Sequence, residues 1–204
     1  MERIDLIAAA DEKARARAIA RAAEVLRGGG IALLAAEGVY GFHASAARGD
    51  AVVRLYRLKE RDPSKGFIGL LANPDDAVRW ARPSPLAVEL AREHWPGALT
   101  LVLPAREDAP APPRTEEGTI ALRCPGAPLL RAIVQAVGEL VLSTSANPPG
   151  EAPLTSAEGP IAGRADLVID EGKRSGIPST VAVVQEDQVR IVRPGSVRLA
   201  GRST

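Results

Sequence analysis

A charged turn between a predicted helix and a predicted strand carries three cations within seven residues. Lys59, Arg61 and Lys65 lie in the stretch Lys59-Glu-Arg-Asp-Pro-Ser-Lys-Gly66. A lysine ammonium supplies a compact positive charge, and an arginine guanidinium binds phosphate oxygens through two parallel hydrogen bonds. The turn therefore suits a polyphosphate ligand. Taken alone, it also fits a solvated helix C-terminus, where the helix dipole favours cations.

A second polar segment, Ser143-Thr-Ser-Ala-Asn147-Pro, directly follows an apolar run. Its hydroxyl and amide groups can hydrogen-bond a nucleotide or a phosphate, and open sheets bind ligands beyond the carboxyl ends of their strands. We therefore take Ser143, Ser145 and Asn147 as candidate binding residues. The same residue types also form ordinary turns.

Later segments add three candidates that are weaker on their own. Ser179 lies in Gly176-Ile-Pro-Ser-Thr180, which enters an apolar run, and Arg193 begins an Arg-Pro-Gly segment that leaves one. Each of these is an ordinary loop by itself. Arg123 ends the apolar stretch that starts at Thr119, and a charge in such a position either faces a site or lies on an exposed edge.

Several familiar catalytic patterns are absent from the sequence. Neither G-x-x-x-x-G-K-[ST] nor G-x-G-x-x-G occurs, so neither usual phosphate loop is present. One cysteine, Cys124, and two histidines, His43 and His94, give no support for a zinc site or a Ser-His-Asp triad. We expect no dedicated metal site, and we interpret both histidines as packing or surface residues and Cys124 as a small buried residue.

The composition indicates one water-soluble domain spanning residues 1–204. Apolar residues make up 46% of the chain, which is enough to bury a core without disulfides. The 26 Lys and Arg nearly balance the 25 Asp and Glu, so bulk charge does not favour a general nucleic-acid or membrane binder. The single cysteine, the acidic start and the short apolar runs predict a cytoplasmic protein with no membrane association.

Helical and strand patterns alternate irregularly along the chain, which predicts an α+β or mixed-sheet α/β domain. Asp50, Asn73 and Ser84 are predicted helix N-caps. Residues 104–118, rich in proline and charge, are predicted to form an exposed loop. Helices are expected at 11–27, after each N-cap and at 127–137, and strands at 31–36, 39–44, 67–72, 98–103, 119–123, 140–143, 167–169, 180–184 and 189–192.

Taken in order, these segments resemble the YrdC-type family of threonylcarbamoyl-AMP synthases over about residues 31–195. Any one segment is a weak signal, but six of them in the family's order and approximate spacing are specific. The six are Glu37-Gly-Val-Tyr-Gly41, Lys59-x-Arg61-x-x-x-Lys65-Gly66, Trp95-Pro-Gly-Ala-Leu-Thr-Leu-Val-Leu103, Thr119-Ile-Ala-Leu-Arg-Cys-Pro125, Ser143-Thr-Ser-Ala-Asn147, and Ser179-Thr180 with Arg193-Pro-Gly195.

The resemblance implies a fold and a reaction. The fold is a twisted, largely antiparallel mixed sheet with helices around a large, open, basic cavity. In the reaction, L-threonine, bicarbonate or CO2, and ATP give L-threonylcarbamoyladenylate and pyrophosphate. Downstream threonylcarbamoyl transferase proteins then modify the adenosine next to the anticodon in certain tRNAs.

The resemblance also implies roles for the candidate residues. Lys59 and Arg61 would be catalytic and, with Lys65, would neutralise the triphosphate. Arg123 and Thr119 would bind threonine. ATP would be a substrate, accompanied by Mg²⁺, and no tightly bound cofactor is expected. The remaining ATP-binding residues would be Ser143, Ser145, Asn147, Ser179 and Arg193.

Two positions depart from the family pattern and leave alternatives open. Ala36 and Gly38 stand where the family has threonines whose hydroxyls lie in its amino-acid pocket. One alternative is therefore a paralogue with altered amino-acid specificity or with carbamoyl-transfer activity. Another is a non-catalytic module that binds double-stranded RNA or tRNA in the basic cavity.

Overall fold

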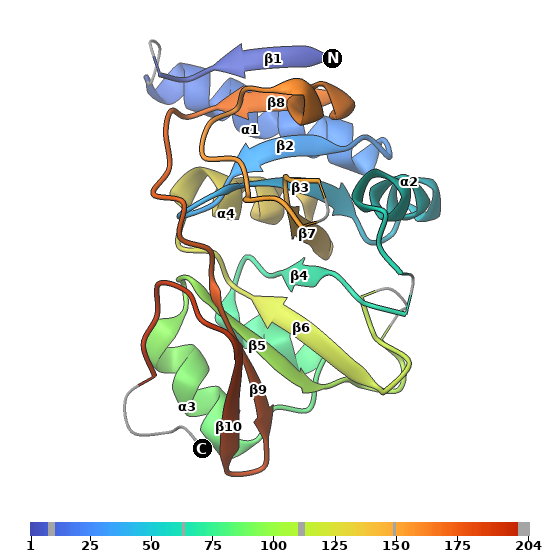
Figure 1. Cartoon of the computed structure of the whole chain (residues 1–204), viewed down its shortest axis with the longest axis vertical. Helices are drawn as coiled ribbons and strands as arrows, with labels where there is room; N and C mark the ends of the chain where they lie inside the picture. Colours follow the sequence, from blue (N-terminus) through green and yellow to red (C-terminus); the bar gives the residue numbers. More distant parts are fainter. Residues whose placement is uncertain (8–10, 63, 110–112, 149, 200–204) are drawn as a thin grey trace.

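The computed structural model describes residues 1–7, 11–62, 64–109, 113–148 and 150–199. Its strands form one sheet in the order β1-β8-β2-β3-β7-β4-β6-β5-β9-β10 (Figure 1). Within the described residues, five neighbouring strand pairs are antiparallel and four are parallel, so the predicted mixed, mostly antiparallel sheet is confirmed. The strands are β1 (Glu2–Asp5), β2 (Ala32–Ala35), β3 (Tyr40–Ser45), β4 (Ile68–Leu70), β5 (Leu99–Pro104), β6 (Thr119–Arg123), β7 (Val141–Ser145), β8 (Leu167–Asp170), β9 (Thr180–Gln185) and β10 (Gln188–Arg193).

Helices pack around this sheet, and two of their predicted N-caps are confirmed. The Ser84 hydroxyl accepts from the backbone N–H of Ala87, and the Asn73 side chain accepts from that of Asp75. None of the helices in the described ranges has the length and apolar character that a bilayer span requires. The helices are α1 (Glu12–Arg27), α2 (Gly49–Lys59), α3 (Pro85–His94), α4 (Pro128–Val137) and two 3-10 helices, η1 (Pro74–Arg79) and η2 (Pro160–Arg164).

The structure corrects some of the predicted boundaries. Asp50 is not the N-cap of α2, because the helix already begins at Gly49 and Arg48 takes the N-cap position without a side-chain cap. The Arg48 guanidinium instead donates to the carbonyl of Arg27 at the end of α1, so a tertiary contact accompanies the start of the helix. Strand β1 and helix η2 were not predicted. Pro63 of the charged turn and 110–112 of the predicted loop lie outside the described residues.

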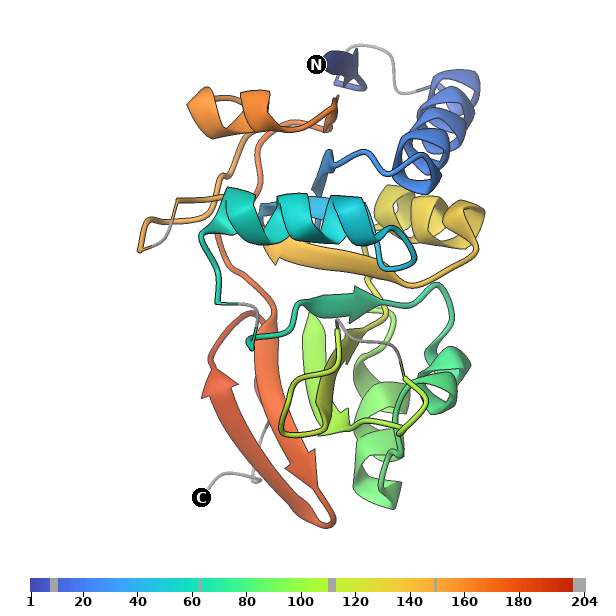
Figure 2. The ribbon, with the colours of Figure 1, turned by 90° about the vertical axis from the view of Figure 1, so that its right-hand side faces the viewer.

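Strand β2 illustrates how the sheet is covered on both faces. Ala32 and Leu34 belong to the apolar cluster that contains α1 and α4, whereas Leu33 and Ala35 belong to the cluster that contains α2. Because alternate strand residues point to opposite faces, this half of the sheet is buried on both sides. Figure 2 shows α1 and α4 together on one side of these strands, with α3 below them. Helix α3 packs with β5, β6 and β9 in a third cluster.

Strand β4 joins the two halves of the sheet and is only three residues long. It pairs antiparallel with β7, where Ile68 faces Ser143, and parallel with β6, where Ile68 faces Ala121. The helix-rich half (β1, β8, β2, β3 and β7) therefore meets the other half (β6, β5, β9 and β10) along a short ladder.

The β8–β9 connection, residues 171–179, crosses from one half of the sheet to the other (Figure 1). It lies directly on the turn between β2 and β3, where Gly176 donates its N–H to the carbonyl of Gly38 at 2.8 Å. A Cβ built on Gly38 would collide with the backbone carbonyl of Ile177. Glycine at position 38 is therefore a consequence of close packing between two backbones.

We expect Gly38→Ala to destabilise the protein by about 1 to 3 kcal/mol, because the added methyl group must push the β8–β9 connection away. Gly49→Ala is the matched control, since a Cβ at Gly49 meets no atom within 4 Å. Urea unfolding followed by circular dichroism measures both. Equal stability of the two variants would contradict the close approach at Gly38.

Candidate active site

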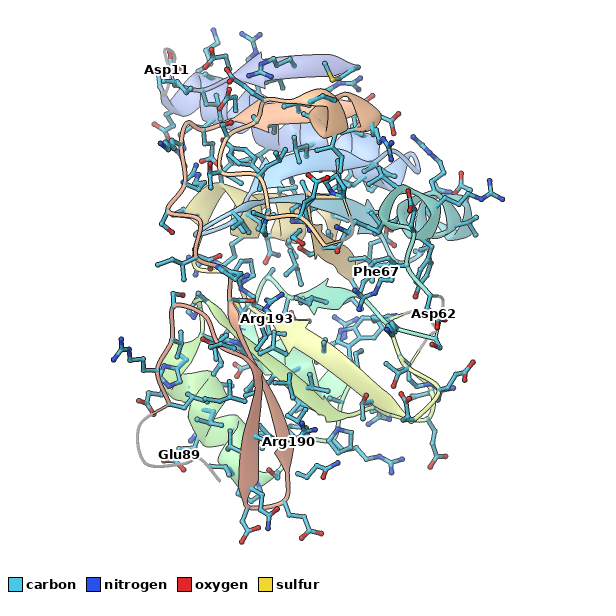
Figure 3. The ribbon with its side chains drawn as sticks, in the orientation of Figure 1. Asp11, Asp62, Phe67, Glu89, Arg190 and Arg193 are labelled. Atoms are coloured by element: carbon cyan, nitrogen blue, oxygen red, sulfur yellow. The ribbon has the colours of Figure 1, made fainter. Side chains whose placement is uncertain are left out.

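A cavity of about 440 Å³ opens beside the middle of the sheet. Ser143 of β7, Ile68 of β4, Ala121 of β6 and Val102 of β5 line it, and they are successive cross-strand neighbours. Direct neighbours present their side chains on the same face, so four strands supply one wall of the cavity. Figure 3 shows Phe67 and Arg193 near β4, in the middle of the molecule. Further lining residues are Arg61, Lys65, Phe67, Thr119, Ser145 and Arg193.

The charged turn supplies two cations to this cavity, Arg61 and Lys65. Arg61 folds back on its own turn: Nε donates to the carbonyl of Lys65 at 3.0 Å and Nη2 to that of Gly66 at 2.8 Å. Its guanidinium carbon lies 5.4 Å from the centre of the Phe67 ring, a cation–π distance. The ring and the two carbonyls therefore hold the guanidinium at the cavity edge.

Lys59 lies deeper, with 9% of its surface exposed. Its ammonium donates to the Ser145 carbonyl at 2.9 Å, to the Asn147 carbonyl at 2.6 Å and to the Asn147 Oδ1 at 2.9 Å. These bonds occupy all three of its donors. Burial, with the nearby charge of Arg61 as the second cause, lowers the pKa of Lys59 to about 8. The charged turn and the Ser143–Asn147 segment thus meet, and Lys59 is the contact between them.

The Ser143–Asn147 segment is held by its own hydrogen bonds as well. The Ser145 hydroxyl donates to the Asn147 Oδ1 at 2.5 Å. The Asn147 Nδ2 donates to the carbonyls of Pro148 at 3.0 Å and Glu151 at 2.7 Å. The Asn147 amide therefore binds protein groups on both its oxygen and its nitrogen, and Ser145 is oriented by it at the cavity wall.

Arg193 enters the cavity from the end of β10 and is fastened to Ser179. Its Nη2 donates to the Ser179 carbonyl and to the Ser179 hydroxyl, both at 2.9 Å. The Ser179 hydroxyl also lies 3.0 Å from the Thr100 Oγ1. Burial lowers the pKa of Arg193, but the guanidinium stays charged near neutral pH. The structure therefore brings these two predicted residues together.

Arg123 and Thr119 occupy opposite ends of β6. With a rise of about 3.3 Å per strand residue, their Cα atoms are about 13 Å apart. Thr119 lines the cavity, and its hydroxyl lies 2.9 Å from the Thr115 hydroxyl. Arg123 is 7% exposed, forms an ion pair with the Glu37 carboxylate and donates through Nε to the Gly97 carbonyl. The resemblance had included Glu37 in a motif, but no role for it was predicted.

His43 was interpreted as a packing or surface residue, and it is completely buried. It faces Ser143 across the β3–β7 ladder, and its Nε2 lies 3.2 Å from the Ser143 hydroxyl oxygen. Ser143 thus separates a buried imidazole from the cavity. A histidine between two apolar strand residues, Phe42 and Ala44, was the available sequence signal.

No cluster of three or more His, Cys, Asp or Glu residues that could hold a metal ion occurs in the described part of the chain. The cavity offers cations, hydroxyls and a carboxylate, Glu117.

Fold and cavity together define a mixed α/β protein with a cationic, hydroxyl-rich cavity beside the centre of its sheet. The chain belongs to the Sua5/YciO/YrdC family, whose model, described as "Telomere recombination", matches residues 24–195.

Individual relatives agree with this assignment. The threonylcarbamoyl-AMP synthase of Bacillus subtilis (strain 168) is 35% identical over 186 residues, which cover 88% of this chain and 54% of that protein. The chain thus spans about half the length of that relative. The structure of P. abyssi Sua5 complexed with L-threonine has a TM-score of 0.84 at 30% identity, covering 96% of this chain and 58% of the other. E. coli YciO has a TM-score of 0.83 at 26% identity, covering 91% and 93%.

The buried imidazole predicts a pH dependence of stability. Burial lowers the pKa of His43 from 6.5 to about 4. As the pH falls below 6.5, the unfolded chain binds a proton that the folded chain refuses until about pH 4, so stability is lost across this window. The loss amounts to roughly 3 kcal/mol.

Urea unfolding at a series of pH values checks this for the wild type and for His43→Gln. The variant has no imidazole at position 43, so its stability should fall less steeply between pH 6.5 and about 4. If the free energy of unfolding fell equally with pH in the two proteins, protonation of His43 would not cause the loss of stability.

Proposed function

We propose that this protein is a threonylcarbamoyl-AMP synthase, which makes L-threonylcarbamoyladenylate and pyrophosphate from L-threonine, bicarbonate or CO2, and ATP. One observation carries the proposal: Arg61, Lys65 and Arg193 share a single cavity with Ser143 and Ser145. Cations on one part of the lining and hydroxyls on another suit a ligand that is part polyphosphate and part nucleoside. The names of the relatives support the same activity.

The chemistry asks little of the protein beyond position and charge. The neutral amine of threonine adds to CO2 and gives up one proton to solvent, forming a carbamate, and a carbamate oxygen attacks the α-phosphorus of ATP. The bond from that phosphorus to the β-phosphate oxygen breaks, and pyrophosphate leaves with the negative charge. Arg61 and Lys65 neutralise the triphosphate and the charge on the departing pyrophosphate. Such stabilisation of developing charge by preorganised cations is usually the largest single contribution to catalysis.

The other nucleotide-binding residues act partly through their protein contacts. Lys59 and Asn147 hold the serine segment at the cavity wall through the bonds described above. Ser179 holds Arg193. The Arg61 guanidinium donates to carbonyls of its own turn. When ATP binds, phosphate oxygens therefore have to replace these carbonyls as its hydrogen-bond acceptors.

We propose that threonine binds at Arg123, while Thr119, about 13 Å away at the other end of β6, lines the cavity. Since the Glu37 carboxylate occupies Arg123, the threonine carboxylate would have to replace it on that guanidinium. Gly38 supplies no side-chain hydroxyl to this region, and Ala36 supplies none either. Support for threonine comes from the relative whose structure contains L-threonine.

Mg²⁺ accompanies ATP and is bound by its phosphates. The product serves threonylcarbamoyl transferase proteins that modify tRNA, and the reaction takes place in the cytoplasm. Direct binding of tRNA or double-stranded RNA to the cavity is the non-catalytic alternative.

The deciding assay incubates the protein with ATP, Mg²⁺ and bicarbonate, with and without L-threonine, and measures pyrophosphate and the adenylate product. Pyrophosphate release that requires threonine supports the synthase. Pyrophosphate release with another small amine instead identifies a paralogue. Binding of RNA that falls steeply with salt, without any product, supports the non-catalytic alternative.

Arg61→Ala should lower kcat by at least about a hundredfold, because it removes a cation aimed at the leaving pyrophosphate. Its stability should stay close to that of the wild type, since among the described residues the guanidinium donates to carbonyls of its own turn and lies over the Phe67 ring. Arg57→Ala, an exposed arginine of α2, is the matched control. Full activity of Arg61→Ala would remove Arg61 from the mechanism.

A further inference from the structure

Arg61 is an exposed residue, yet its guanidinium is held by two kinds of contact. It donates to the carbonyls of Lys65 and Gly66, at 3.0 and 2.8 Å. It also lies over the Phe67 ring, whose centre is 5.4 Å from the guanidinium carbon. A phosphate ligand affects these two kinds of contact differently, and this difference gives the ring a role of its own.

Phosphate competes with the carbonyls for Arg61 but not with the ring. Phosphate oxygens accept hydrogen bonds from guanidinium N–H groups, and the two carbonyls use such donors in the free protein. The ring attracts the guanidinium electrostatically, through the negative charge density above its face, and needs no particular N–H to do so. A phosphate that takes the N–H donors therefore breaks the carbonyl bonds and leaves the contact with Phe67 in place.

Helix α2 fixes the Phe67 ring and the turn that carries Arg61. Phe67 is 2% exposed, and its ring centre lies 4.4 Å from that of Tyr56 in α2. Tyr56 also contacts the charged turn at two points. Its carbonyl accepts from the backbone N–H of Arg61 at 3.1 Å, and its hydroxyl donates to the Lys65 carbonyl at 3.4 Å. The exposed Arg61 side chain thus lies over a buried, fixed aromatic surface.

We infer that Phe67, supported by Tyr56, is a positioning residue whose ring keeps the Arg61 guanidinium at the cavity edge while phosphate oxygens replace the carbonyls as its hydrogen-bond acceptors. Without the ring, the ligand alone would have to order a long side chain, and the entropy lost in doing so weakens binding. The free protein loses less, because the carbonyls still hold Arg61. This inference deepens the proposed function and rests on it in placing a polyphosphate at Arg61.

Calorimetry with inorganic tripolyphosphate tests the inference without nucleotide or threonine. We expect Phe67→Leu, which stays apolar but lacks the ring, to weaken binding by roughly twofold to fivefold, the range for one exposed cation–π contact. Phe42→Leu is the matched control, because it makes the same substitution in the same buried apolar cluster. Its affinity should equal that of the wild type. Phe67→Tyr, which keeps an aromatic ring, should bind like the wild type.

A double-mutant cycle separates this role from a general loosening of the core. In an Arg61→Ala background the ring has no guanidinium to hold, so Phe67→Leu should leave the remaining affinity unchanged. An equal loss in both backgrounds, or in Phe42→Leu, would show that repacking of the core causes the effect and would overturn the inference. Undiminished affinity of Phe67→Leu would overturn it as well.

Nuclear magnetic resonance of the wild type tests the position of the guanidinium directly, even if Phe67→Leu fails to fold. The ring current of Phe67 should shift the Arg61 side-chain proton signals out of the ordinary arginine range, and the shift should persist when tripolyphosphate saturates the site. Arg61→Lys assigns these signals in arginine-labelled protein. Loss of the shift on binding, or no binding of tripolyphosphate, would overturn the inference. Protein that binds as expected but releases no pyrophosphate would contradict the proposed function alone.

Discussion

The three hydrogen bonds of the Lys59 ammonium hold the centre of this molecule together. A buried cation is costly unless its donors are satisfied, and here the end of α2 supplies the cation while the end of β7 supplies the oxygens. Because Arg61 and Lys65 follow Lys59 in the chain, this contact also determines where they lie. The charged turn and the Ser143–Asn147 segment face the same cavity because the Lys59 side chain joins them.

The sequence was sufficient to predict the parts of this arrangement but not all of its contacts. Charge and hydroxyl chemistry identified the Arg61 turn and the Ser143 segment, and both line the cavity. Lys59 was expected to meet phosphate, yet its donors point to protein oxygens. Its partner Asn147 is 88 positions away in the chain, and no local pattern reports which acceptor a buried cation chooses. The ion pair between Glu37 and Arg123 was missed for the same reason.

The secondary structure was likewise predictable where the local sequence determines it, but not where a distant segment does. Strands with continuous apolar runs, such as β2 and β9, were predicted to within two residues. In β2 the run reflects burial on both faces, whereas in β9 buried and half-buried apolar residues alternate. Strand β1 carries charges at three of its four positions, and it exists because β8 pairs with it in parallel. The contact of His43 was also not predictable from local sequence. Its chain neighbours are ordinary strand residues, and its partner Ser143 comes from another strand.

The shortness of β4 has a mechanical consequence. Between β7 and β6 the sheet is continuous through three residues only, while the strands on either side are longer and carry their own packed helices. Within the sheet, only a short ladder of three residue pairs on each side of β4 therefore resists a change in the angle between the two halves. The cavity lies across it, with lining residues from both halves. Small changes in the angle between the halves therefore change the width of the cavity without disturbing either core.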